Sequence, residues 1–356
     1  MPSARICPIA LLLAAIGCKG EPPLPAAPTL PAVEPAVSLT PPAVTGWVGP
    51  TSAAVGPDGG VAVLDAGDQV LWRFQADGQA PRQVGRTGRG PGEFRSPGEV
   101  AINDAGELGV LDLERRLVVF DAAGAHLRSL ALEGGTPTAL LPSTGGFVVR
   151  LARPGVGGSL LYVHIGAEAG GRTDTLVTVR SEAGVAGSTA CQFCPTALSP
   201  DGTVILASGD TTYAIRELDR AAGLVRTWAR QDVPSIPLSG KERDSALSRW
   251  DAAYAALRAR GGPSMPLPAI ARFKRRILPH GLAFDGRSRL WVQRSVAETE
   301  PATFDLFTRE GGFLGEVRLD RPGELLALRG STLVVLHAPD PGVADVAVYW
   351  MRDPGP

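Results

Sequence analysis

The chain has 356 residues, of which 44% are hydrophobic, 20% charged and 6% aromatic, and it contains 44 glycines and 32 prolines. So many turn-forming residues beside so much apolar sequence exclude a disordered chain and favour a globular protein with many short strands. The 35 basic and 36 acidic residues nearly cancel. We therefore expect no nucleic-acid partner, because no strong positive field is available to attract one.

Residues 1–17 have the organisation of a signal peptide. Arg5 precedes the apolar segment 9–16, which is too short to cross a membrane as a helix. The run Ala15-Ile16-Gly17-Cys18 resembles the bacterial lipobox, which implies that Cys18 is lipidated; the alternative is an ordinary secretory signal. The residue after the cysteine, Lys19, resembles the outer-membrane sorting pattern. The resemblance implies an exported protein at the periplasmic face of the outer membrane or at the cell surface.

Residues 18–45 are rich in proline and almost uncharged. Such a composition predicts an extended, semi-rigid tether that holds a folded domain away from a lipid surface. We therefore expect contact with the membrane only through the lipid anchor, and a folded domain over residues 46–356.

A strand-turn-strand unit recurs along that domain. It is clearest after the glycine-rich loop 85–92, where Pro97 is followed by the apolar residues 100–102, the turn 103–106 and a second apolar strand at 108–111. A third strand follows in three copies, at residues 70–74, 117–120 and 303–307. The copies begin at Pro50, Pro97, Pro137, Pro195, Pro279 and Pro322, at intervals of about 47, 40, 58, 84 and 43 residues. This period predicts an all-β, six-bladed β-propeller with four strands in each blade.

The last copy has room for only three strands, at 325–328, 333–337 and 345–351. A propeller closes its ring to remove exposed sheet edges. We expect the segment 43–48, just before the first copy, to supply the missing fourth strand.

The run 85–124, GRTGRGPGEFRSPGEVAI followed by GELGVLDLERRLVVFDAAG after three residues, resembles the NHL-type repeat of six-bladed propellers. With the lipobox and the proline-rich tether, the whole chain resembles the bacterial TolB-like propeller lipoproteins. The resemblance covers most of the chain, is poorest in the third copy, and is specific for the fold rather than for an activity.

The longest interval contains a predicted helix. Ser239 and Glu242 have the spacing of a capping box, and Gly261-Gly262 closes the helical run, which predicts an insertion over 236–276 with its helix at about 239–262. Leu247, Trp250, Tyr254 and Leu257 recur at helical spacing and share one face. The insertion either caps one face of the propeller or packs on the outside of blades four and five.

Cys191 and Cys194 lie just before the fourth copy. In an oxidising compartment they favour a local disulfide. Unpaired thiols and a metal or redox role are the alternatives. Pro195 follows the pair where a haem attachment site has histidine, and zinc would need two further ligands.

His280 is the candidate residue of the central channel, because the repeat places it at the start of an innermost strand. The equivalent positions are Thr51, Gly98, Thr138, Thr196 and Gly323. We expect no metal and no cofactor, because a ring of threonine and glycine cannot hold a divalent ion tightly. Arg89, in the glycine-rich loop, is a second candidate for ligand binding, although that loop lacks the Lys-Ser/Thr ending of a nucleotide-binding loop.

No nucleophile elbow, HExxH motif or serine triad is present in the sequence. The sequence therefore favours a monomeric, non-enzymatic module of the cell envelope whose partner is an envelope protein or a small molecule. The alternative is a metal-dependent hydrolase or lyase with its site in the central channel around His280.

Overall fold

A computed structural model describes residues 29–42, 46–153, 159–166, 173–180, 194–207, 212–219, 223–259, 272–340 and 343–354. The predicted signal peptide and Cys18 lie outside these residues, so export and lipidation stay predictions.

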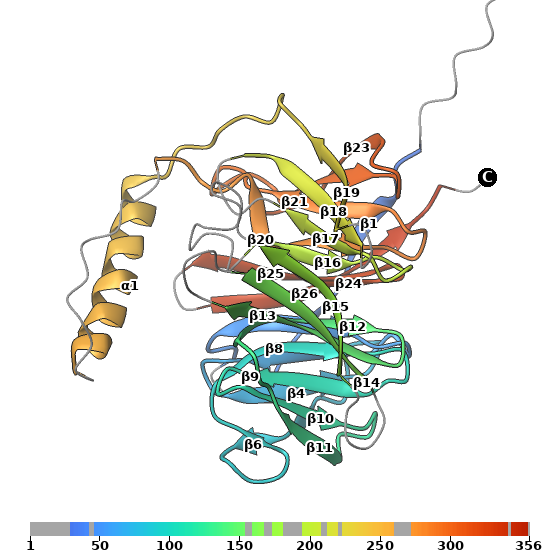
Figure 1. Ribbon diagram of the computed structural model, residues 1–356. Helices are drawn as coiled ribbons and strands as arrows, with labels where there is room; N and C mark the ends of the chain where they lie inside the picture. The colour runs from blue at the N-terminus through green and yellow to red at the C-terminus, as the bar shows by residue number, and fades with distance from the viewer. Residues whose placement is uncertain are drawn as a thin grey trace, which may run out of the picture.

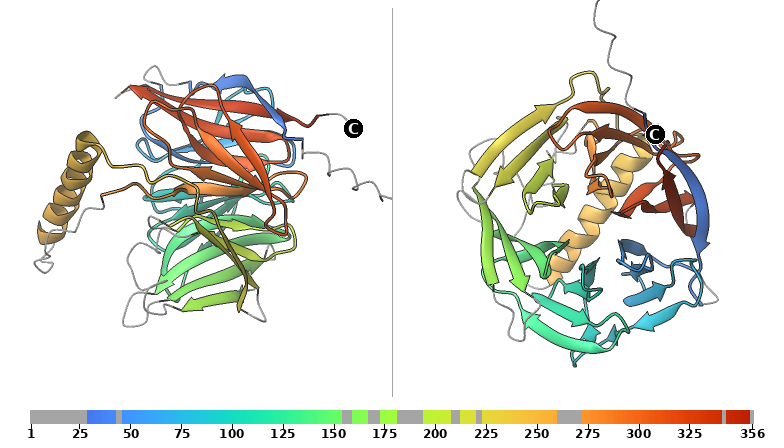
Figure 2. Two further views of the ribbon diagram at one scale, coloured as in Figure 1. Left: turned by 90° about the horizontal axis from the view of Figure 1, so that it is seen from above. Right: turned by 90° about the vertical axis from the view of Figure 1, so that its right-hand side faces the viewer.

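The described strands form six four-stranded antiparallel sheets arranged as blades around a central axis (Figures 1 and 2). This arrangement confirms the predicted six-bladed β-propeller. A small parallel pair, β6 (Arg86–Thr87) and β7 (Glu93–Phe94), lies in the glycine-rich loop outside the blades.

Within each blade the strands follow one another outwards from the axis in chain order, except that the outermost strand of blade six comes from the N-terminal part of the chain. Blades one to three consist of β2 (Pro50–Val55), β3 (Val61–Asp65), β4 (Val70–Phe74) and β5 (Arg82–Val84); β8 (Pro97–Ile102), β9 (Leu108–Asp112), β10 (Arg116–Phe120) and β11 (His126–Ala131); and β12 (Thr136–Ser143), β13 (Gly146–Arg153), β14 (Ser159–Gly166) and β15 (Thr173–Arg180). Blades four to six consist of β16 (Thr196–Leu198), β17 (Val204–Ala207), β18 (Ala214–Asp219) and β19 (Gly223–Ala229); β20 (Ile277–Phe284), β21 (Leu290–Arg294), β22 (Thr303–Phe307) and β23 (Phe313–Arg318); and β24 (Glu324–Arg329), β25 (Thr332–Asp340), β26 (Val343–Arg352) and β1 (Ala32–Leu39).

Tight turns connect the two innermost strands of a blade. Gly59 and Gly106 have φ of 78° and 80° in these turns, a conformation that glycine adopts without steric cost. The side chain of Asn103 stabilises the second turn, because its Oδ1 accepts the N–H groups of Ala105 at 3.0 Å and Glu107 at 2.9 Å. Such local chemistry explains why the hairpins could be recognised in the sequence.

An aspartate at the end of the second strand ties neighbouring segments together in blades one and two. Asp65 is 2% exposed, and its carboxylate accepts the N–H groups of Val48 and Gly49, each at 2.8 Å. Asp112 is fully buried and accepts the N–H groups of Arg95 and Ser96, at 3.1 and 3.2 Å. Each aspartate therefore fixes the chain just before the innermost strand of its own blade.

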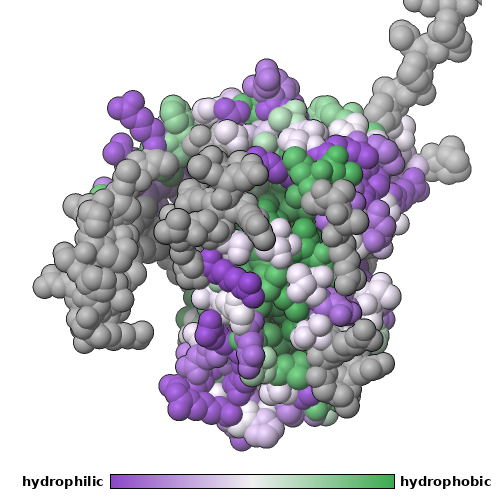
Figure 3. Space-filling model, viewed as in Figure 1, coloured by the Kyte–Doolittle hydropathy of each residue, from purple (hydrophilic) through white to green (hydrophobic). Residues whose placement is uncertain are grey.

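The hydrophobic core consists of layers between blades rather than one central mass. One layer joins blades one and two through buried side chains such as Leu64, Phe94 and Phe120. Another joins blades five and six, where the Trp291 and Phe304 rings meet edge to face at 5.5 Å. Figure 3 shows apolar side chains as a green band along the side of the ring that faces the viewer. The innermost strands lie around the middle of the ring and line the channel.

The strand that closes the ring is β1, which pairs with β26 in antiparallel register from Ala32 opposite Arg352 to Leu39 opposite Val346. The prediction that 43–48 closes the ring is wrong, and part of the predicted tether belongs to the sixth blade. Pro35 lies at a register shift in β1. Proline is tolerated there because β1 is an edge strand, and the outer side of an edge strand needs no N–H donor for the sheet.

Trp47 connects the closing strand β1 to the first blade. Its indole Nε1–H donates to the Leu39 carbonyl at 2.8 Å, and its ring lies 6.1 Å from that of Phe74, centroid to centroid. Trp47 is only 6% exposed. The two ends of the chain therefore meet in one buried cluster.

The predicted insertion helix is confirmed as α1 (Gly240–Ala259). Ser239 and Glu242 form the predicted capping box: the Ser239 N–H donates to Glu242 Oε2 at 2.8 Å, and the Glu242 N–H donates to Ser239 Oγ at 3.2 Å. The Lys274 ammonium lies 2.6 Å from Glu242 Oε1. The start of the helix is therefore held both by its own cap and by the returning chain.

Figure 2 shows α1 lying across the centre of the ring on one face and standing off from the blades. This position agrees with a cap over a propeller face and differs from a helix packed outside blades four and five. A short antiparallel stalk holds it, in which the Leu238 N–H donates to the Arg272 carbonyl at 3.0 Å and the Lys274 N–H to the Ile236 carbonyl at 2.8 Å. The side chains of Trp250, Tyr254 and Leu257 lie outside the described residues, so their shared face stays a prediction.

Candidate functional site

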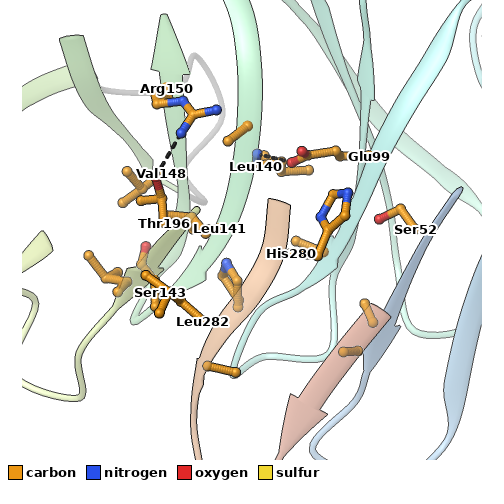
Figure 4. Close-up of a pocket in the computed structure, with 18 of the residues that line it drawn as sticks. Ser52, Glu99, Leu140, Leu141, Ser143, Val148, Arg150, Thr196, His280 and Leu282 are labelled. Carbon is orange, nitrogen blue, oxygen red and sulfur yellow. Dashed lines mark hydrogen bonds between the residues drawn. The ribbon is translucent and has the colours of Figure 1, made fainter. Parts of the chain in front are cut away.

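The innermost strands surround a cavity of about 1000 Å³ along the axis of the ring, which we call the channel (Figure 4). The first strands of all six blades contribute to its wall. Strands β2, β8, β12, β16, β20 and β24 run in the same sense along the axis, so their beginnings surround one mouth and their hairpin turns the other.

An irregularity near the start of the innermost strands decides which side chains face the channel. The register with the second strand shifts between Pro50 and Ser52, between Pro97 and Glu99, and between Pro137 and Ala139. An extra residue in one strand re-aims the following side chains. As a result, Ser52 and Glu99 belong to the channel wall although they follow the positions that the repeat pointed to.

Glu99 is the only carboxylate that Figure 4 labels in the channel. Its Oε2 accepts the N–H of Leu140, in the next blade, at 2.5 Å. Burial raises the pKa of Glu99, although the charge of His280, the bond from Leu140 and the charge of Arg150 all act to lower it. The loss of hydration therefore destabilises the ionised carboxylate more than its neighbours stabilise it.

Ser52 occupies the equivalent place in blade one. Its Oγ accepts the N–H of Val100, in blade two, at 3.1 Å. The same inter-blade bond is therefore made by a hydroxyl in one blade and by a carboxylate in the next.

Arg150, on β13, is 3% exposed. Its guanidinium donates to Thr196 Oγ1 at 2.7 Å (Figure 4). It also donates to the Cys194 carbonyl at 2.6 Å and to Thr138 Oγ1 at 2.9 Å. A further bond runs to the Thr138 carbonyl at 3.1 Å. Arg150 therefore joins blades three and four and places a buried positive charge beside the channel.

His280 lines the channel, as the repeat predicted, and its ring lies near Glu99 in Figure 4. It is exposed rather than packed into a core. The other candidate, Arg89, is an exposed residue of the glycine-rich loop and is not part of the channel wall. Its backbone carbonyl accepts a bond from Arg116 at 3.2 Å. The structure therefore places only one of the two predicted ligand-binding residues in the channel.

The predicted ring of small residues is largely present, since Thr51, Gly98, Thr138 and Thr196 all line the channel. Gly323 does not line it; instead it lies against the buried ring of His337. Sequence reasoning missed two charged residues of the channel wall, Glu99 and Arg150. The signal was available in both strands, because a single charged residue interrupts an apolar run in PGEVAI and in FVVRLA.

Further along the innermost strands the channel has an apolar zone. Partly exposed side chains of four blades line this part: Leu141, Leu198, Phe284, Leu326 and Leu328. Charged side chains line the cavity again at the other mouth, beside the hairpin turns: Asp104, Asp201 and Arg329. The channel therefore has an apolar zone between two polar mouths.

Among the described residues, no group of three or more histidine, cysteine, aspartate or glutamate side chains could hold a metal ion. Cys194 is 2% exposed, whereas Cys191 lies outside the described residues, so the predicted disulfide stays a prediction. No helix in the described part of the chain is long and apolar enough to cross a membrane.

Comparisons with known proteins agree on the fold. A family model described as a 6-bladed beta-propeller matches residues 57–134. The chain is similar to the structure of a member of the duf4221 family from Bacteroides vulgatus, with 8% identity, 92% of this chain and 99% of that chain covered, and a TM-score of 0.53. A search of curated proteins finds no match.

Two enzymes are among the similar structures. A gluconolactonase from Xanthomonas campestris is 12% identical, with 93% of this chain and 99% of that chain covered and a TM-score of 0.49. A streptogramin B lyase is 8% identical, with 91% and 98% covered and a TM-score of 0.46. Similarities this distant do not carry an activity over to this chain.

Proposed function

We propose that this protein is an exported, lipid-anchored β-propeller that binds a small ligand in its channel and does not catalyse a reaction. The observation that carries the proposal is the channel itself, a cavity of about 1000 Å³ with an apolar zone between two polar mouths. Ligand sites in proteins are concave, mostly apolar and equipped with a few polar groups that orient the ligand. The channel has these three properties.

The position of α1 supports the same function. The helix is inserted between the outermost strand of blade four and the innermost strand of blade five, so it leaves the ring at the face where the innermost strands begin. His280 and Glu99 lie towards that same mouth. A helix held across a ligand-binding mouth can restrict which molecules enter it.

The proposed location at the cell envelope rests on the sequence alone. A lipid at Cys18 would hold the propeller at an envelope surface through residues 19–31, because the ring already begins at β1. The available reach is therefore shorter than a tether ending at residue 45 would provide. We propose no other membrane contact.

The proposal can be tested with N-phenyl-1-naphthylamine, a neutral apolar dye whose fluorescence rises in apolar sites. We expect saturable binding to the wild type. Leu141→Trp fills the channel at a partly exposed wall position and should weaken binding at least about tenfold, which corresponds to about 1.4 kcal/mol. The dye is excited outside the tryptophan band, so the new indole does not interfere.

The matched control is Leu127→Trp, the same substitution at a leucine that is 47% exposed on β11, outside the channel wall. It should leave dye binding unchanged. Leu326→Trp provides a second filling variant from another blade, in case the first does not fold. Equal dye affinity in the wild type and in both folded channel variants would refute binding in the channel.

A further inference from the structure

At the mouth where the innermost strands begin, Glu99 has only one of its two carboxylate oxygens in a hydrogen bond. Glu99 Oε2 accepts the Leu140 N–H at 2.5 Å, while Oε1 has no hydrogen-bond partner among the described residues. An ionised carboxylate can accept several hydrogen bonds through its two oxygens. Because Glu99 lines the cavity, its second oxygen is an acceptor that a ligand in the channel could use.

The task of joining two blades does not require a carboxylate at this position. Ser52 makes the equivalent bond to Val100 with a hydroxyl group at 3.1 Å, and a hydroxyl carries no desolvation cost for a charge. Burial raises the pKa of Glu99 despite the nearby charges of His280 and Arg150, so the ionised carboxylate is disfavoured in the ligand-free protein. The fold therefore does not require a charged side chain at position 99.

The nearby arginine does not neutralise Glu99 through a hydrogen bond. Arg150 directs its guanidinium at Thr138, Cys194 and Thr196, and each of these acceptors is a neutral oxygen. A guanidinium so engaged contributes positive charge at a distance but has its donors directed into the wall. The channel wall therefore offers a ligand an acceptor at Glu99, whereas these Arg150 donors already bind oxygens of the wall.

From this geometry we propose that the channel selects ligands with an ammonium head group, held by Glu99 Oε1, and an apolar body lying along Leu141 and its neighbours. The inference rests on the proposed function and specifies its ligand class. A charge-assisted hydrogen bond from an ammonium to a carboxylate is stronger than a neutral one. The ammonium also adds a direct counter-charge to a carboxylate whose ionised form is disfavoured by burial.

The test compares three probes with the same eight-carbon tail: octylammonium, octanol and octanoate. Each competes with N-phenyl-1-naphthylamine at pH 8, where histidine side chains are mostly uncharged and alkylamines stay charged. We expect octylammonium to bind about tenfold more tightly than octanol, from the usual strength of a hydrogen bond to a charged group. Octanoate should bind most weakly, because its charge would face that of Glu99.

Glu99→Gln is the decisive variant, because it keeps an oxygen for the Leu140 N–H and nearly the same volume but removes the charge. We expect it to reduce the preference for octylammonium over octanol to less than about threefold. Glu114→Gln is the matched control: it makes the same substitution at an exposed glutamate outside the channel wall. It should retain the wild-type order of the three probes.

The outcomes separate the two proposals. If the dye binds in the channel but octanoate competes best, or if Glu99→Gln keeps the full ammonium preference, the ligand class is wrong and channel binding stands. If the dye is insensitive to the filling variants, both proposals fail. The wild-type order with loss of ammonium preference in Glu99→Gln alone supports the inference.

Discussion

The most informative perturbation of the fold is Leu39→Ala in the closing strand. Leu39 is 2% exposed and belongs to the cluster in which blade six meets blade one. Replacing a buried leucine by alanine typically costs about 2–5 kcal/mol, because transfer energy is lost and a cavity is left. An edge strand can relax partly, so we expect about 3 kcal/mol. At about 2 °C per kcal/mol for a large domain, the melting temperature should fall by about 6 °C.

The assay is thermal unfolding followed by circular dichroism, with two control variants. Val48→Ala changes the segment that the sequence favoured for ring closure, where Val48 is 56% exposed. Leu127→Ala changes a leucine that is 47% exposed on β11. Both should shift the melting temperature by about 1 °C or less, as surface substitutions usually do. A loss in Val48→Ala without one in Leu39→Ala would refute the assignment of β1 as the closing strand.

Three further predictions concern other parts of the molecule. Burial lowers the pKa of His337, so the unfolded chain binds a proton at this histidine more readily than the folded chain does. The free energy of unfolding should therefore fall as the pH drops below about 6.5, the ordinary histidine value. Denaturant unfolding of His337→Gln should lack this contribution, and a pH slope equal to that of the wild type would contradict the prediction. Ser239→Ala removes half of the capping box and should weaken α1 by about 1 kcal/mol, seen as faster amide exchange in 240–259 with the blades unchanged; equal exchange rates would show that the stalk alone holds the helix. Cys18→Ser should move the protein from the membrane to the soluble fraction and abolish labelling with palmitate, and a variant that stays with the membrane would rule out the lipid anchor.

The candidate site was predictable where it depends on the repeat and unpredictable where it depends on strand register. His280 was placed in the channel because each copy begins in the same way, and the copies align by their prolines. Glu99 was missed because the register shift between Pro97 and Glu99 accompanies a channel wall that includes the residue after the predicted position as well. Arg150 was missed because it reaches the channel from a second strand, through contacts with blade four that no local pattern encodes.

The number and type of the blades could be predicted from the amino-acid order alone, because each hairpin is a short-range structure with its own turn chemistry. The capping box of α1 was legible for the same reason, since its two residues lie three positions apart. The closure of the ring and the meeting of charges in the channel depend instead on contacts between segments that are distant in the chain. The pairing of β1 with β26 joins segments that are far apart in the chain. Because an edge strand tolerates proline, residues 32–39 can form a strand although their composition is that of a tether.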